Sequence, residues 1–416
     1  MWSRASGSTI NAMRPLLLVI RTGKREFREY LLRSIAPHYR VHMFAVAAPS
    51  WELDYVDGYT RVDTGDVDAM VKAAQDLDDI SGVLCWDEAR IPHAAELAKA
   101  LDLPGDPASI ARCRDKQLTR QALAAAGVPQ PGSRQVDDVG QALEAAHHFG
   151  YPVIIKPTDL AVSAGVMRVG DDEQMVSAFE YVSGLKHGGI PGWKPTILVE
   201  ECAQGKEISI DTAVHRGDIY PLCLAHKEIG YAPYCIEVGH HVQADEPLLH
   251  DPELLGLLQD IHRALGFTDG VTHTEIMLTA DGPKVIEVNG RLGGDVIPYL
   301  GWQATGVDTA LAAAAVACGN PPQVVHDRNL VAAVRFFYPA AEDTVMRSIR
   351  FDFGPQGAPP AVDQLAVLPK IGSVKSPPPK GTVAGRIAFA TAVGQSLHDC
   401  RLALDAAEKA LLVNED

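Results

Sequence analysis

The sequence predicts an α/β protein of several domains, in which a helix-covered parallel sheet is followed by a smaller domain and then by an antiparallel sheet. Its 416 residues exceed what one hydrophobic core usually organises. Short apolar runs alternate with amphipathic stretches over residues 15–100, as is typical of a parallel sheet covered by helices. From residue 196 to 242 strand-like segments follow one another instead, which indicates an α+β organisation in the C-terminal part.

The N-terminal region, residues 14–105, is expected to form the first α/β domain. Its predicted elements are, in order, a strand at 16–20, a helix at 27–35, a strand at 41–47, a helix at 67–77 and a strand at 82–86. No Gly-x-Gly-x-x-Gly follows the first strand, so a dinucleotide site is not indicated. Residues 1–13 are serine-rich and lack an apolar core, so we interpret them as a leader or an added remnant, with Met13 as an alternative start to Met1.

A turn-rich stretch at 103–107 marks the start of a small central domain, residues 106–195. Its predicted elements are helices at 115–126, 137–149 and 171–184, a strand at 152–156 and an exposed insertion before residue 195. The C-terminal domain, residues 196–416, is expected to end in a substrate-binding or lid subdomain. After its first strands we predict a helix at 252–265, a hairpin, a helix at 309–318, strands at 331–337 and 385–390, and a final helix at 397–412.

The composition excludes several classes of function. A net charge of −16 argues against binding the phosphate backbone of nucleic acids, and no apolar run is long enough to span a bilayer. The seven cysteines are scattered, form no Cys-x-x-Cys pair and are odd in number, which argues against a disulfide framework. We therefore expect reduced thiols and a cytoplasmic protein.

The most informative pattern consists of two alternating runs on either side of residues 280–282. A three-residue hairpin loop favours glycine at its last position, as here, and would place Glu275 opposite Glu287. His273 and Asn289 would then face each other on the same side of the sheet. Two carboxylates face to face repel, and a hard divalent cation removes that penalty, so we predict a magnesium site. A two-residue loop would put the carboxylates on opposite faces and would contradict this prediction.

An ordinary solvated strand face is the alternative interpretation of the hairpin. The expected distribution of apolar side chains argues against it, with Ile276, Leu278, Ile286 and Val288 on the other face and Met277 and Val285 partly covering the carboxylate side. Arg291 continues the row of carboxylates by the period of two. His273 either orients a carboxylate or substrate or is a hydrogen-bonded structural histidine.

Two other segments are suited to a polyphosphate nucleotide. Lys156 ends a buried strand, and small residues in the following loop let backbone N–H groups approach phosphate oxygens; they include Ser163, Ala164 and Gly165. An exposed lysine at a strand end is the alternative, and no Walker A sequence occurs. A second strand runs into residues 200–203, whose backbone groups could pair with an adenine edge, although glutamate after a strand is common. Lys116 carries little information by itself.

Taken together and in order, these segments resemble the ATP-grasp superfamily, and within it the carboxylate–amine ligases that include the L-amino acid ligases. The resemblance covers nearly the whole chain. It is strongest in His273-Thr274-Glu275, in residues 291–294, and in the tail at residues 332–337 and 385–387. It implies an N-terminal α/β domain, a small central domain and a C-terminal domain, with the nucleotide between the last two.

The resemblance implies a role for each candidate residue. Lys116 and Lys156 match the two nucleotide-phosphate lysines, and the loop with Ser163, Ala164 and Gly165 matches the flexible phosphate loop. The adenine hinge corresponds to Glu200, Glu201, Cys202 and Ala203, and the ribose carboxylate to Glu207. The metal ligands correspond to Glu275, Glu287 and Asn289, and the arginine at the transferred phosphate to Arg291.

The implied reaction is activation of a carboxylate by ATP and Mg²⁺, for which Mn²⁺ can substitute, followed by attack of an amine on an acyl phosphate. The main alternative is a ligase that uses a thiol, bicarbonate or another acceptor. A non-catalytic ATP-binding subunit is disfavoured because the metal ligands and the phosphate arginine are all present. A zinc hydrolase is disfavoured because His273 and Glu275 lack a second ligand pair nearby.

The substrates are expected to be small molecules, most simply amino acids, and the protein could be a homodimer. We place the carboxylate pocket near residues 291–299 and 227–241. The candidate substrate residues are His273, Gly293, Gly294 and Arg335. For Arg335 a structural salt bridge is an equal alternative. Three further histidines could touch substrate or simply lie on strands: His226, His240 and His241.

Overall fold

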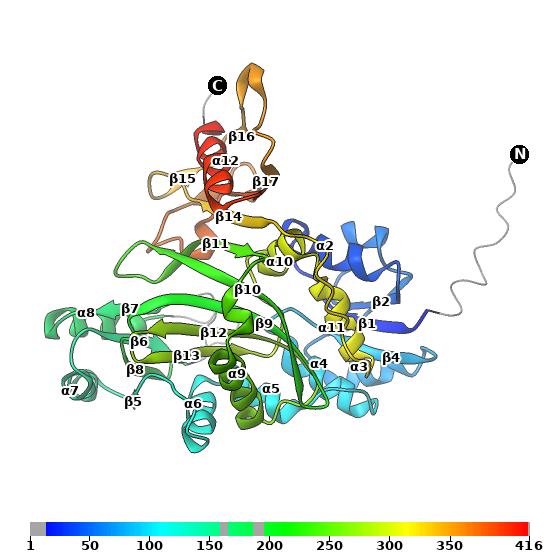
Figure 1. Cartoon of the computed structure of the whole chain (residues 1–416), viewed down its shortest axis with the longest axis horizontal. Helices are drawn as coiled ribbons and strands as arrows, with labels where there is room; N and C mark the ends of the chain where they lie inside the picture. The colour runs from blue at the N-terminus through cyan, green and yellow to red at the C-terminus, as the bar shows by residue number, and fades with distance from the viewer. Residues whose placement is uncertain (1–13, 159–164, 186–194, 415–416) are drawn as a thin grey trace, which may run out of the picture.

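The computed structural model describes residues 14–158, 165–185 and 195–414. Figure 1 shows a broad base, with the N-terminal region at one end, a large sheet in the middle and the small central region at the other end. The C-terminal region rises from this base as a separate projection. Among the described helices, none combines the length and apolar character that a membrane crossing requires.

The N-terminal region contains a parallel sheet, as predicted, with four strands in the order β3-β2-β1-β4, one more than the sequence indicated. Its strands are β1 (Leu16–Ile20), β2 (Arg40–Ala45), β3 (Gly58–Arg61) and β4 (Ile80–Leu84). Every residue of β1 is buried, which explains its unbroken apolar run. The helices of this region are α2 (Arg25–Ile35), α3 (Val67–Ala74) and α4 (Ile91–Ala100), of which α4 was not predicted, and neither was β3.

The central region is a four-stranded antiparallel sheet in the order β5-β8-β6-β7. Its strands are β5 (Ser133–Val136), β6 (Val153–Pro157), β7 (Met167–Val169) and β8 (Ile197–Glu201), so the sheet continues past the expected boundary at residue 195. Helices α7 (Val139–Phe149) and α8 (Asp172–Ser183) pack on it around one apolar cluster. Asp138 and Asp171 cap these helices, each accepting a backbone N–H through its side chain.

Helices α5 (Pro107–Arg114) and α6 (Lys116–Ala125) connect the two regions, and Asp115 caps α6. The largest sheet has eight strands in the order β13-β12-β9-β10-β11-β14-β19-β17, with antiparallel neighbours. Its strands are β9 (Gly205–His215), β10 (Asp218–Gly230), β11 (Ile236–Gln243), β12 (Gly270–Thr279), β13 (Gly282–Asn289), β14 (Val331–Phe337), β17 (Val362–Val367) and β19 (Ala388–Gly394). Helices α9 (Pro252–Leu265), α10 (Ile297–Thr305) and α11 (Thr309–Ala317) are packed against this sheet and its neighbours.

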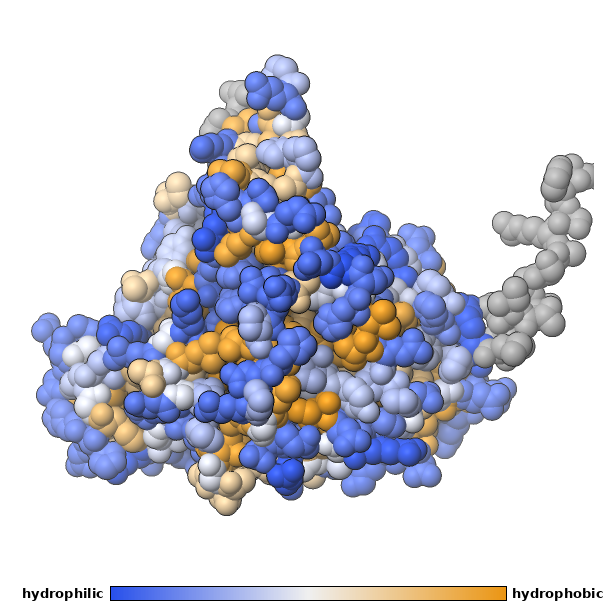
Figure 2. Space-filling view, in the orientation of Figure 1, coloured by the Kyte–Doolittle hydropathy of each residue, from blue (hydrophilic) through white to orange (hydrophobic). Residues whose placement is uncertain are grey.

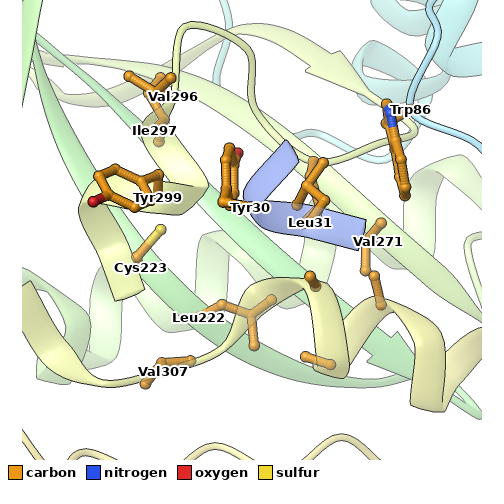
Figure 3. Packing of buried hydrophobic residues seen from close by; sticks show 14 of the residues in the cluster. Tyr30, Leu31, Trp86, Leu222, Cys223, Val271, Val296, Ile297, Tyr299 and Val307 are labelled. Carbon is orange, nitrogen blue, oxygen red and sulfur yellow. The ribbon is translucent and has the colours of Figure 1, made fainter. Parts of the chain in front are cut away.

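One apolar cluster joins the N-terminal region to the large sheet. Figure 3 shows Tyr30 and Leu31 of α2 beside Tyr299 of α10 and Val271 of β12, and the rings of Tyr30 and Tyr299 lie 5.3 Å apart. Each of these side chains is largely buried, and burial of one large apolar side chain contributes about 1.5–3 kcal/mol. The cluster therefore fixes the segment between β13 and α10 against the N-terminal region.

In the C-terminal projection, α12 (Leu397–Ala410) packs on β14 and β19. Two short two-stranded sheets complete it, β15 (Thr344–Val345) with β18 (Val374–Lys375), and β16 (Ile349–Phe351) with β20 (Leu411–Val413). The strand predicted at 385–390 begins later, at Ala388. The two residues before it are engaged elsewhere: Gly385 packs against the Ser376 carbonyl, and the Arg386 side chain forms an ion pair with Asp295.

Figure 2 shows hydrophilic side chains over most of the visible face, with hydrophobic patches mainly along its middle, below the C-terminal projection. The remaining short elements are 3-10 turns: η1 (Trp51–Asp54), η2 (Pro247–His250), η3 (Gly354–Gln356) and η4 (Val383–Gly385).

Candidate active site

A cavity of about 410 Å³ lies between the central sheet and the face of the large sheet formed by β9 to β13. This volume is in the range of small-molecule sites. Most of the residues singled out in the sequence line it: Lys116, Lys156, Glu200, Glu201, Cys202, Ala203, Glu207, His273, Glu275, Glu287, Asn289, Arg291 and Gly294. Positions far apart in the sequence therefore meet in one place.

The other candidate residues lie elsewhere. Arg335 of β14 forms ion pairs of 2.8 Å with Asp405 and 2.7 Å with Glu408 of α12, so it holds the helix to the sheet and does not line the cavity. The backbone N–H of Gly293 donates to Asp211. Gly165 is buried beside Pro157 at the end of β6. Ser163 and Ala164 lie outside the described residues.

The hairpin loop differs from the prediction, yet the facing of the carboxylates is kept. Thr279 pairs with Gly282, so the loop has two residues and not three. A bulge then shifts the register: Ile276 pairs with Val285, whereas Glu275 pairs with Glu287. The predicted loop was wrong, and the extra residue of the bulge restores the pairing that a two-residue loop alone would have destroyed.

The bulge also exchanges two neighbouring side chains relative to the prediction. Val285, expected on the carboxylate side, is buried in the core with Ile276 and Val288. Ile286, expected in that core, lines the cavity beside Met277. Because one residue is inserted, two consecutive residues, Ile286 and Glu287, both face the cavity.

The predicted metal ligands are held by lysines. Lys116 Nζ lies 3.2 Å from Glu287 Oε1, and Lys227 Nζ lies 3.1 Å from Glu275 Oε2. Burial alone would raise the pKa of Glu275, but Lys227 and His273 overcome this and hold it well below its usual value. Two carboxylates on paired strands and the nearby Asn289 amide form the oxygen donor set that Mg²⁺ prefers, so these residues fit such an ion.

His273 joins this group to the loop after β13. Its Nδ1 lies 2.7 Å from Asp211 Oδ1, and its Nε2 lies 3.6 Å from Glu275 Oε1. Burial lowers the pKa of His273, but the hydrogen bond to Asp211 and the Glu275 carboxylate raise it to about 9. Asp211 also accepts the Gly293 N–H at 3.1 Å, so one buried carboxylate orients both the histidine and the glycine segment.

A buried ionic cluster, which the sequence did not reveal, positions Lys156. Glu200 accepts from Lys156 Nζ at 2.7 Å and from Arg120 Nε at 2.9 Å. Arg120 also donates to the carbonyls of Val285 at 3.1 Å and Ile286 at 2.8 Å, and thus ties α6 to the bulge. Burial opposes ionisation of Glu200, but the two cations lower its pKa to about 2. The Glu200 side chain is therefore engaged with Lys156 and Arg120.

Lys227 of β10 is a second central cation, which the sequence placed only within a substrate segment. Its side chain is 2% exposed, and its Nζ lies 2.7 Å from Glu207, 2.6 Å from Glu237 and 3.1 Å from Glu275. Burial would lower its pKa, but the three carboxylates raise it well above the usual value. The sequence of β10 around Lys227 contains no recognisable motif. Only the fold shows that Lys227 faces three carboxylates.

The N-terminal region contacts Arg291 and Gly293, beside the cavity, through Glu88 and Arg28. Glu88, just after β4, accepts from Arg291 Nε and from Arg114 Nη1, the latter at 2.8 Å. Arg28 of α2 donates to the Gly293 carbonyl at 3.3 Å. Burial would lower the pKa of Arg291, but Glu88 raises it, so the guanidinium is charged and oriented. Neither Glu88 nor Arg28 lies in a recognisable motif.

Comparisons with known proteins agree with this geometry. Residues 149–299 match the family described as the ATP-grasp domain. The chain is 32% identical over 312 residues to the uncharacterized protein y4rH of Sinorhizobium fredii, covering 71% of this chain and 62% of that one. It is 28% identical over 250 residues to Dapdiamide A synthase of Enterobacter agglomerans, covering 58% of this chain and 57% of that protein. The chain thus spans less than two thirds of the length of these relatives.

Solved structures match over nearly the whole chain. An L-amino acid ligase from Bacillus licheniformis superposes with a TM-score of 0.78 at 20% identity, covering 97% of this chain and 99% of the other. A phosphoribosylglycinamide synthetase from Anaerococcus prevotii gives a TM-score of 0.73 at 17% identity, covering 97% and 100%. At these identities the likeness concerns the fold, and it confirms the predicted fold class. The chain therefore carries an ATP-grasp domain at residues 149–299 and shares the fold of these two solved structures over almost its entire length.

Proposed function

We propose that the protein is an ATP-dependent carboxylate–amine ligase that forms an amide bond and releases ADP and phosphate. The observation that carries the proposal is the convergence of two lysines, two facing glutamates with an asparagine, and one arginine on a single cavity. The names of relatives support it, since Dapdiamide A synthase and the human carnosine synthase 1, 26% identical over 252 residues, are both synthases. Peptide or amide formation is the chemistry that these names share with L-amino acid ligase.

The nucleotide is proposed to bind with its phosphates at Lys116 and Lys156 and its base near residues 200–203. Glu275, Glu287 and Asn289 would hold Mg²⁺, or Mn²⁺ in its place. A bound divalent ion supplies positive charge that offsets the charge of the phosphates. The contact between Lys116 and Glu287 supports this placement of nucleotide and metal. The two side chains lie 3.2 Å apart, so the proposed phosphate-binding cation is adjacent to a proposed metal ligand.

The proposed first step forms an acyl phosphate. A carboxylate oxygen of the substrate attacks the γ-phosphorus of ATP, the bond to the bridging oxygen breaks, and ADP leaves with that electron pair. Arg291, held by Glu88, and Lys156, held by Glu200, face the negative charge that spreads over the transferred group. Their ion pairs fix both cations before the substrate binds, so little reorganisation is needed.

In the second step an amine attacks the acyl carbon and the carbon–oxygen bond to phosphate breaks. Phosphate leaves with that electron pair and takes up the proton that the amine nitrogen loses. The two sheets that flank the cavity limit the access of water, which would favour the amine as the nucleophile. We propose amino acids as the substrates. A thiol acceptor remains the alternative, and no feature of the described residues favours it.

Substrate-dependent release of ADP tests the proposal. The protein is incubated with MgATP, hydroxylamine and a panel of carboxylic acids that includes the standard amino acids. We expect at least one acid to give ADP, phosphate and a hydroxamate in equal amounts. Release of AMP and pyrophosphate would contradict the acyl-phosphate route, and absence of any acid-dependent product would contradict ligase activity.

A further inference from the structure

The C-terminal projection reaches the cavity through one side chain. Val383, in the turn η4, is half-buried and lines the cavity. All other described residues of the cavity wall lie between positions 116 and 297. A region with no other part in the proposed reaction therefore contributes one apolar residue to the place where the reaction occurs.

Side chains on three sides hold η4 in place. Arg386, directly after the turn, is buried and donates to both carboxylate oxygens of Asp295, at 2.7 and 2.8 Å. It also donates to the backbone carbonyl of Glu237 in β11 at 3.0 Å. From β18, Lys375 Nζ donates to a backbone carbonyl of the turn at 2.7 Å. The position of Val383 on the cavity wall is therefore fixed by the fold.

The backbone before Val383 is in an unfavourable conformation. Thr382 has a φ of 36° and a ψ of −142°, and a positive φ is rare for a β-branched residue. Gly381 and Gly385 pack so closely on the Ser376 carbonyl that a Cβ at either position would collide with it. Strain of this kind persists only where the surroundings impose it, and it is concentrated at binding sites.

Three isoleucines surround the place that Val383 faces. Ile229 and Ile236 line the cavity from adjacent positions of the β10–β11 pair, and Ile297 lines it from the first turn of α10. Arg386 contacts the residue after Ile236 and the residue two positions before Ile297. Because Val383 is only three residues from Arg386, the four aliphatic side chains come together at one end of the cavity.

This end of the wall suits an apolar group. Aliphatic side chains offer no hydrogen bond, so a polar group packed against them loses its bonds to water without replacement. An apolar group packed there gains the free energy of removing its surface from water. Valine and isoleucine are stiff at χ1, so the wall adjusts little to groups of different size.

We propose that Val383 determines which substrate side chains the enzyme accepts, and that the preferred substrate carries an apolar side chain that packs against it. The inference rests on the proposed function, to which it adds the class of side chain and the residue that selects it. The side chain belongs either to the acid that is activated or to the amine that attacks, and two assays distinguish these sources.

The first assay measures hydroxamate formation with MgATP, so that only the acid varies. The second measures ADP release with one fixed acid and a varied amine. Each uses alanine, valine, leucine, phenylalanine and threonine. In one of the two assays we expect kcat/KM for valine to exceed that for threonine by about tenfold or more, because the threonine hydroxyl has the same volume but finds no partner in an apolar pocket.

Two substitutions test Val383 itself. Val383→Ala should raise kcat/KM for phenylalanine relative to valine at least about tenfold, because removal of two methyl groups opens space for the larger side chain. Val383→Thr keeps the shape and should lower kcat/KM for valine and leucine alike, by about three- to thirtyfold, without changing their ratio. In both variants KM for MgATP should stay within about threefold of wild type.

Val374→Ala is the matched control. Val374 lies on β18 of the same projection, is 55% exposed and is not part of the cavity wall. The same truncation there should leave every ratio as in wild type. If Val383→Ala folds poorly, as judged by its thermal unfolding midpoint, the isosteric Val383→Thr carries the test.

Four results would overturn the inference. An unchanged ratio of phenylalanine to valine in Val383→Ala, in both assays, would show that Val383 does not select the side chain, while the ligase function stands. Equal use of valine and threonine by the wild type would contradict the apolar class. A rise in KM for MgATP without a change in the ratio would place Val383 at the nucleotide. Absence of ADP release with every acid would remove the proposed function and the inference together.

Discussion

Replacing Arg120 by methionine should weaken the protein around the bulge of β13. Arg120 is 5% exposed and donates to Glu200 at 2.9 and 3.2 Å, to Val285 at 3.1 Å and to Ile286 at 2.8 Å. Methionine keeps much of the side-chain volume but leaves a buried carboxylate and two buried carbonyls without these donors. Removing one partner of a buried ion pair costs about 3–5 kcal/mol. Because Lys156 still faces Glu200 at 2.7 Å, we expect the lower end, about 3 kcal/mol.

Urea denaturation followed by pulse proteolysis gives the midpoint of the unfolding transition that contains the bulge, and the shift in this midpoint multiplied by the m-value gives the loss of stability. Arg263→Met is the matched control, because Arg263 pairs with Asp260 on the surface with 71% of its side chain exposed. The control should differ from wild type by less than about 0.5 kcal/mol. If Arg120→Met has the same urea midpoint as the control, then the cluster of Arg120, Glu200 and Lys156 does not hold the bulge in place.

Four further predictions concern the cavity and its surroundings. Glu287→Gln should reduce metal-dependent ADP release by at least about 100-fold. The control Glu253→Gln, at an exposed position on α9, should not reduce it, and equal activities of the two variants would contradict the proposed metal site. Cys202 and Cys235 line the cavity, so MgATP should slow their alkylation as followed by mass spectrometry, and undiminished labelling would place the nucleotide elsewhere. Because burial raises the pKa of the Cys235 thiol to about 11, its alkylation rate should still be rising with pH between about 8 and 10. Arg335→Ala should cost about 1 kcal/mol or less and leave every KM unchanged, and a tenfold rise in a substrate KM would restore it as a binding residue.

The sequence predicted the parallel N-terminal sheet, because short apolar runs alternate there with amphipathic stretches. It also predicted the pairing of Glu275 with Glu287, although from a three-residue loop that the structure does not contain. The sequence did not predict the bulge. One inserted residue shifts the strand register by one position but leaves the order of apolar and polar residues almost unchanged. A three-residue loop and a two-residue loop with a bulge both place Glu275 opposite Glu287. Only Val285 and Ile286, which exchange faces, distinguish them.

The residues that sequence reasoning missed share a physical property, which is that their partners are distant in the chain. In the sequence, Arg120 looks like a solvent-exposed helix residue. In the fold, α6 lies beside β8 and β13, and Arg120 bonds to Glu200 and to the Ile286 carbonyl. Lys227 reads as one charge in an alternating strand until three carboxylates surround it. A buried charge is recognised by its partners, and a single sequence does not show which of its acids a given lysine or arginine meets.

The apolar cluster that contains Tyr30, Leu31 and Tyr299 bears on how the protein can be divided. A fragment that begins at the central domain would leave the faces of Val271 and Tyr299 open to water and would lose Glu88, the partner of Arg291. Residues 106–416 alone therefore do not form an independent unit. A chimaera that exchanges substrate specificity should keep α2, β4 and the segment before α10 from the same parent.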